Sequence, residues 1–138
     1  MTPFLVDAGF FVALYNRRER MHSRCVDMYQ SLEGLFVTCE ACITEAFHIL
    51  NHASAAVDAL LNRIEQGALE VPFRLGDLAP KVRELMSKYR DSPADFADAC
   101  LIQMAEELGT GDILTLDSDF ARYRWRRNRS FNLLIPLN

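Results

Sequence analysis

The chain alternates short apolar runs with longer segments in which apolar positions recur every three or four residues. Apolar runs of this length, bounded by polar residues or glycine, are typical of buried strands. We predict such strands at 4–6, 35–38, 69–73, 113–116 and 131–137. The longer segments have the periodicity of helices, which we predict at about 8–15, 22–32, 41–50, 54–66, 76–89 and 93–106. Strands that alternate with helices predict an α/β protein with a mostly parallel central sheet.

The last of these helices has an unusual composition. Ser92 would cap it, Pro93 fits its first turn, and Gly109 would end it. Its first turns carry Asp95 and Asp98, and the remainder is apolar nearly all round, so the helix should be buried. Carboxylates at the mouth of a buried helix are costly unless something pairs with them, and the helix itself contains no cation. A metal ion is therefore a candidate partner.

Composition and charge restrict the class of protein. The 138 residues are half hydrophobic and carry a formal net charge of −4, which indicates one globular domain over residues 1–138 rather than a general nucleic-acid coat protein. No stretch approaches the roughly twenty apolar residues of a membrane span. The N-terminus lacks the features of a secretory signal, and four cysteines do not make a disulfide scaffold. We therefore expect a cytoplasmic protein with reduced thiols.

Four separated acidic residues should meet at one edge of the predicted sheet. Asp7 and Asp117 each follow a predicted strand directly, whereas Glu45 lies in a helix that follows a strand and Asp98 lies near the start of another helix. In open α/β sheets the ligand site lies at the carboxyl ends of the strands. Crowded carboxylates repel one another unless a divalent cation holds them, and oxygen-only ligands suit Mg²⁺ or Mn²⁺. Such a site could activate water and stabilise in-line attack on a phosphodiester. Alternatively, each acid caps a helix or complements its dipole.

The segments that carry these acids resemble the motifs of a known family. They are Phe4–Leu14, Ile43–Leu50, Ala94–Ala99 and Ile113–Phe120. In order and spacing they are similar to the motifs of PIN-domain proteins, and most of all to the VapC-type toxin ribonucleases of prokaryotic toxin–antitoxin pairs. The resemblance spans nearly the whole chain. Each motif is short and degenerate alone, and the specificity comes from the set.

The resemblance implies a fold, an activity and a set of site residues. The fold would be a three-layer α/β/α sandwich, and the activity a ribonuclease that needs Mg²⁺ or Mn²⁺. Members are often homodimers and often inhibited by a small cognate antitoxin. The metal-binding and catalytic acids map onto Asp7, Glu45, Asp98 and Asp117.

The chain departs from the family pattern after its first acid. Ala8 and Gly9 stand where the family usually has residues such as serine, which removes side-chain hydrogen bonds that could order the Asp7 loop. The fourth acid is ambiguous, because Asp119 is an alternative to Asp117. Asp95, three residues before Asp98, could support the site from outside.

An arginine-rich stretch, Arg122–Arg129, stands out in this acidic chain. Its arginines are interleaved with Tyr123 and Trp125, a composition that suits phosphate contacts together with stacking on bases. A solvated loop, or a surface for a dimer or partner, would have the same composition. The candidate RNA-binding residues are Arg122, Arg124, Arg126 and Arg127, with Arg17 and Arg18 from the loop after the first helix.

Three functions remain open at this point. The first is a metal-dependent endoribonuclease that acts as a toxin. The second, favoured by Gly9, is a catalytically weak PIN-like module that binds RNA or a protein. The third is a redox protein, because Cys39 and Cys42 form a CxxC motif between a strand and a helix. Two small buried residues at that junction would explain the motif equally.

Overall fold

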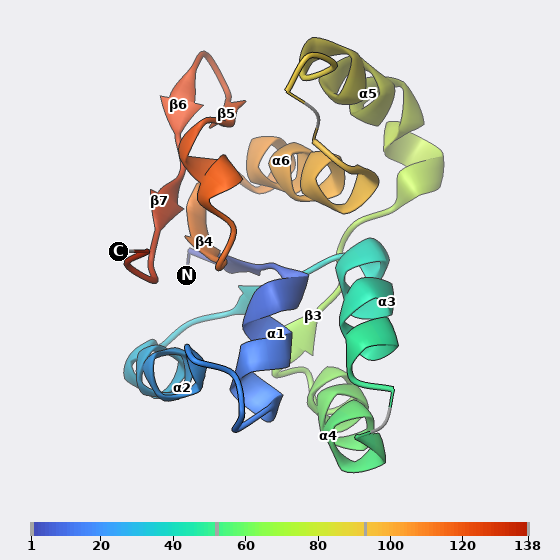
Figure 1. Ribbon diagram of the computed structural model, residues 1–138. Helices are drawn as coiled ribbons and strands as arrows, with labels where there is room; N and C mark the ends of the chain where they lie inside the picture. The colour runs from blue at the N-terminus through green and yellow to red at the C-terminus, as the bar shows by residue number, and fades with distance from the viewer. Residues whose placement is uncertain (1, 52, 93, 138) are drawn as a thin grey trace.

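A parallel sheet of five strands forms the centre of the molecule in the computed structural model, which describes residues 2–51, 53–92 and 94–137 (Figure 1). In spatial order the strands are β3 (Leu69–Glu70), β2 (Phe36–Val37), β1 (Phe4–Val6), β4 (Asp112–Leu114) and β7 (Asn132–Leu133). All neighbouring pairs are parallel. The predicted α/β class with a parallel sheet is therefore confirmed.

Helices cover the sheet on both sides (Figure 1). Their bounds are α1 (Ala8–Tyr15), α2 (His22–Ser31), α3 (Glu40–Ile49), α4 (Ser54–Glu65), α5 (Leu75–Lys88) and α6 (Phe96–Leu108). Helix α5 packs on α6, and α1 packs on α2 and α3. The parallel crossovers place these helices over the apolar strands, which explains why the strand centres Leu5 and Ile113 have no exposed surface. Within the described ranges, no helix is long and apolar enough to cross a membrane.

Helix α6 begins later than its sequence predicts. The N-cap is Asp95, whose carboxylate accepts a hydrogen bond of 2.8 Å from the amide of Asp98. Ser92 is therefore not the cap, and its hydroxyl instead accepts a hydrogen bond from the guanidinium of Arg122. Pro93 lies outside the described residues. The helix ends at Gly109, whose left-handed φ of 71° disfavours residues with a Cβ. The predicted burial is confirmed, because every residue from 97 to 105 is buried.

The arginine-rich stretch is not a loop but a small hairpin. A 3₁₀ turn, η1 (Ser118–Ala121), leads into the antiparallel strands β5 (Arg124–Trp125) and β6 (Arg129–Ser130). Tyr123 and Trp125 are only 0% and 7% exposed, and they pack with Phe120 and Phe131. The predicted stacking of these two rings on RNA bases is therefore wrong, because both already belong to the core.

Candidate metal centre

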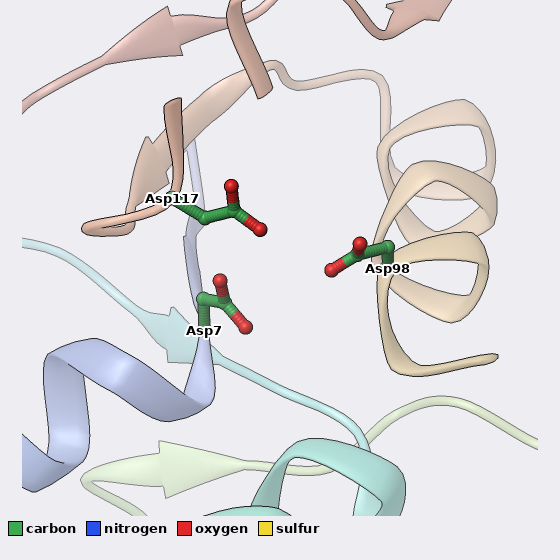
Figure 2. A group of neighbouring side chains, drawn as sticks. All are labelled: Asp7, Asp98 and Asp117. Carbon is green, nitrogen blue, oxygen red and sulfur yellow. The ribbon is translucent and has the colours of Figure 1, made fainter. Parts of the chain in front are cut away.

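Two adjacent parallel strands bring the first and last acids of the site together. Asp7 follows β1, and its amide donates a hydrogen bond of 3.0 Å to the carbonyl of Leu114 at the end of β4. Asp117 lies just beyond β4 and caps η1. Asp98 reaches the same point from the first turn of α6. Ligand oxygens of these three aspartates all lie within 4.8 Å of one another, and Figure 2 shows the carboxylates pointing toward a common centre.

The other predicted acids lie around this cluster rather than in it. Glu45 on α3 is exposed and is not a member of the three-carboxylate group, although its charge acts on Asp7. Asp95 is occupied as the cap of α6. Asp119 forms an ion pair with Arg122, with an oxygen-to-nitrogen distance of 2.9 Å. Of the two candidates for the fourth acid, the geometry thus brings Asp117 into the cluster and leaves Asp119 outside it.

A threonine orients Asp7, and sequence reasoning missed it. The hydroxyl of Thr115 donates a hydrogen bond of 2.7 Å to Oδ2 of Asp7 and accepts one of 3.0 Å from the amide of Asp117. The amide of Ala8 donates to Oδ1 of Asp7 at 2.8 Å. These contacts replace the side-chain hydrogen bonds that Ala8 and Gly9 cannot make. The available signal was the position of Thr115, which directly follows β4 and stands two residues before Asp117.

A tyrosine orients the third acid, Asp98, through a hydrogen bond of the same kind. The hydroxyl of Tyr123 donates a hydrogen bond of 3.0 Å to Oδ2 of Asp98, and both side chains are buried. Its ring packs edge-on against Phe120, which fixes the position of the hydroxyl. The sequence presented Tyr123 among arginines, so its position suggested an exposed side chain. A buried tyrosine needs a partner for its hydroxyl, and here that partner is a carboxylate.

The cluster is short of positive charge. The pKa of Asp7 is raised to about 6 and that of Asp98 to about 7, from an ordinary value of 3.8, and burial is the largest cause. Neighbouring carboxylates contribute to the rise in both pKa values, and the hydrogen bonds from Thr115 and Tyr123 oppose it. In the described part of the chain, the ion pairs join Arg74 to Asp77, Lys81 to Glu107 and Arg122 to Asp119, so none reaches the cluster.

This donor set fits a hard divalent cation. All three donors are carboxylate oxygens, which suit Mg²⁺ or Mn²⁺ rather than the nitrogen and sulfur sites of structural zinc. Asp7 and Asp98 are each 7% exposed, so a charge brought to them would be only partly screened by water. The raised pKa values show that the three negative charges are costly together, and a cation at their centre would remove that cost.

The CxxC cysteines lie beneath this site. The sulfur atoms of Cys39 and Cys42 are 3.6 Å apart, and the thiol of Cys42 lies 3.8 Å from Oδ1 of Asp7. Both residues are 0% exposed. Disulfide exchange requires a partner to reach one of the sulfurs, so this burial argues against a thioredoxin-like function. The alternative of two small residues packed at a strand–helix junction agrees with the observed positions.

The predicted RNA-binding arginines lie at different places. Arg122 is beside the site, bonded to Asp119 and Ser92. Arg124 is half-buried and donates to the carbonyls of Ala121 and Tyr123. Arg126 lies at the opposite end of α6, where its Nε donates a hydrogen bond of 2.8 Å to the carbonyl of Glu106.

The remaining candidates are exposed and lie away from the carboxylates. Arg127 is exposed in the turn of the β5–β6 hairpin. Arg17 and Arg18 follow the C-terminal end of α1, whose eight residues lead about 12 Å away from Asp7. Proximity to the site therefore distinguishes Arg122 from the others.

Known proteins match this chain at the level of family and fold. A family model described as PIN domain matches residues 4–126. The structure is similar to that of Mycobacterium tuberculosis VapC20, described as a toxin that cleaves the sarcin–ricin loop, with a TM-score of 0.79 and 22% sequence identity. The similarity covers 91% of this chain and 98% of VapC20. No curated protein matches the chain by sequence.

Proposed function

Because this chain belongs to the PIN-domain family, we propose that it is a Mg²⁺- or Mn²⁺-dependent endoribonuclease that hydrolyses phosphodiester bonds of RNA. The observation that carries the proposal is the convergence of Asp7, Asp98 and Asp117 from three separate elements, although none of the three forms an ion pair with a cationic side chain of the described residues. A merely structural set of helix caps has no need to meet at one point.

Each site residue has a role in this proposal. Asp7, Asp98 and Asp117 would hold the cation, and Glu45 would contribute from the exposed side of the site. A divalent cation supplies a lowered pKa for water and charge neutralisation at the attacked phosphate. Thr115 and Tyr123 keep the carboxylate oxygens of Asp7 and Asp98 directed toward the centre, which lowers the cost of assembling the site.

We further propose that the protein is a cytoplasmic toxin whose activity is held in check by a small antitoxin protein, and that it acts as a homodimer. The support is the fold shared with VapC20, which is itself described as a toxin. A small reading frame beside the gene, encoding a DNA-binding N-terminus, would support the antitoxin.

A catalytically weak RNA-binding module is the second candidate. The sequence suggested this candidate because Gly9 removes a side chain two residues after Asp7. A Cβ at Gly9 would meet only the Cβ of Leu116, at 3.9 Å, so the glycine is not required by a close contact. Because Thr115 and the amide of Ala8 already orient Asp7, the glycine leaves the carboxylate ordered, and this favours the enzyme.

The deciding experiment is RNA cleavage by the purified protein in Mg²⁺ or Mn²⁺ against EDTA. We expect cleavage that requires the metal and falls at least about 100-fold in Asp98→Asn, because a missing ligand weakens the cation and its water together. Asp58→Asn, an exposed acid on α4, is the matched control and should cleave as the parent does. Metal-dependent cleavage that survives in Asp98→Asn would reject the proposed site. Salt-sensitive RNA binding without cleavage in either metal would favour the binding module.

A further inference from the structure

The turn of the β5–β6 hairpin concentrates positive charge on one exposed point of an acidic protein. Arg126, Arg127 and Arg129 surround Asn128 there, and all four are exposed, whereas the whole chain carries a net charge of −4. Across residues 2–51, 53–92 and 94–137, no carboxylate forms an ion pair with any of these arginines. Their charge is therefore available to an anion from outside.

The backbone that carries these arginines is held in place by contacts at the base of the hairpin. Trp125 is buried at its base and donates a hydrogen bond of 3.1 Å to the carbonyl of Ser130. A Cβ at Gly111 would lie 2.3 Å from the indole nitrogen of Trp125, so the ring packs directly on the glycine backbone. Arg126 ties the turn to α6 through its amide and Nε, both bonded to Glu106. Guanidinium groups on a rigid element lose less entropy when they bind an anion.

The backbone of the turn is also unusual. Arg126, Arg127 and Asn128 have successive φ values of 22°, 45° and 71°, a left-handed region that residues with a Cβ seldom adopt. All three residues are exposed, and none of them is a glycine, which would adopt this region freely. The guanidinium of Arg129 lies over the Trp125 ring, 5.4 Å from its centroid, and so extends the same surface.

This basic turn is far from the carboxylate cluster. Asp98 lies in the first turn of α6, and Arg126 is bonded near its other end. The part of the helix from Asp98 to Glu106 spans about 12 Å, and in Figure 1 the hairpin projects from the body beyond the end of α6. One phosphate cannot contact both places. At about 3.4 Å per nucleotide of a stacked strand, the two places are at least about four nucleotides apart.

We propose that the β5–β6 turn, through Arg127 and Arg129, is a second RNA-binding site that holds backbone phosphates at least about four nucleotides from the bond cut at the carboxylate cluster. The inference rests on the proposed function, because it assumes that RNA is the substrate at that cluster. Planar guanidinium groups bind phosphate through paired hydrogen bonds. With Tyr123 and Trp125 buried, the turn offers charge without a stacking surface, so it would position RNA without reading its sequence.

Fluorescence anisotropy in EDTA tests the inference without any cleavage. The probes are a labelled single-stranded RNA of 20 nucleotides, which can span both places, and one of 2 nucleotides, which cannot. We expect Arg127→Glu to weaken binding of the longer RNA about 10-fold and to lower the slope of log Kd against log salt by about 0.7, the value of one phosphate contact. The Kd of the short RNA should not change, so the Kd of the short RNA divided by that of the longer RNA should fall about 10-fold.

Arg24→Glu is the matched control, because Arg24 is exposed on α2, on the other side of the sheet, and the charge change is the same (Figure 1). Arg129→Gln is a second variant, expected to weaken the longer RNA about 3-fold. An unchanged Kd and slope in Arg127→Glu would overturn the inference and leave the turn as a surface for an acidic protein. Equal weakening in Arg24→Glu would also overturn it, as an effect of net charge. Neither result depends on cleavage, so failure of the proposed enzyme activity would be seen separately.

Discussion

At the scale of single residues, the site depends on uncharged hydroxyl groups as much as on its acids. Thr115 touches both Asp7 and Asp117, and Tyr123 touches Asp98. The contacts of Thr115 with Asp7 and of Tyr123 with Asp98 join residues that are distant in the chain. Partners of this kind around metal ligands fix their orientation and tune their basicity. The acids can be predicted from strand ends, whereas these partners follow only from the way the elements pack.

Replacing Thr115 by valine tests this positioning role. Valine has nearly the same shape but cannot donate to Asp7 or accept from the amide of Asp117. We expect Mn²⁺ affinity, measured by calorimetry, to fall about 10-fold or more, and RNA cleavage to fall with it. The unfolding free energy should drop by about 1–3 kcal/mol because a buried polar group loses its partner. Thr115→Ser retains the hydroxyl and should restore the metal affinity. Equal Mn²⁺ affinities in the valine and serine variants would contradict the role.

At the scale of elements, the first turn of α6 carries two acids with separate tasks. Asp95 caps the helix and Asp98 faces the cluster. Ser92 and Asp95 are both good N-cap residues, and the proline at position 93 favoured Ser92 in the sequence. Tertiary packing decided otherwise, because Ser92 is engaged by Arg122. A choice between two caps three residues apart depends on contacts that local sequence does not contain.

The two properties of Asp95 can be separated by substitution. Asp95→Ala removes the cap, and we expect it to lower the unfolding free energy in urea by about 1 kcal/mol. Asp95→Asn keeps an oxygen that can accept from the amide of Asp98, so its stability should lie within a few tenths of a kcal/mol of the parent. Because the charge of Asp95 raises the pKa of Asp98, it also attracts a cation there, so the asparagine variant should bind Mn²⁺ less tightly than the parent at pH 7.5. Equal destabilisation by alanine and asparagine would show that the cap is unimportant.

At the scale of the whole molecule, the positions of the strands along the chain follow from the apolar pattern, whereas the structure of the stretch from 122 to 129 does not. The apolar runs at 4–6 and 113–116 form the neighbouring strands β1 and β4. Asp7 and Asp117 follow these strands and lie close together, as the sequence predicted. The stretch from 122 to 129 is mostly polar, and its buried side depends on the two rings of Tyr123 and Trp125. A pattern of alternating arginine and aromatic residues fits an exposed RNA-binding loop and a half-buried strand equally. Only the packing of the rings distinguishes them.

The raised pKa values also connect the site with the stability of the whole fold. Between about pH 4 and pH 7, the folded metal-free protein holds protons on Asp7 and Asp98 that the unfolded chain has released. The native state then binds more protons than the unfolded state, so the contribution of these two groups to stability falls as pH rises through this window. It is fully present only below the ordinary pKa of 3.8.

Thermal unfolding of the parent and of Asp98→Asn, in EDTA and in Mn²⁺, tests this connection. Without metal, we expect the variant to have the higher Tm at pH 7.5, by about 3 °C for ~1 kcal/mol, and the difference should vanish near pH 4 where the parent carboxyl is neutral. Mn²⁺ should raise the Tm of the parent more at pH 7.5 than at pH 5, because protons compete for the same oxygens. Asp58→Asn should follow the parent throughout. A difference between Asp98→Asn and the parent that is independent of pH would mean that packing, rather than crowded charge, sets the stability of the site.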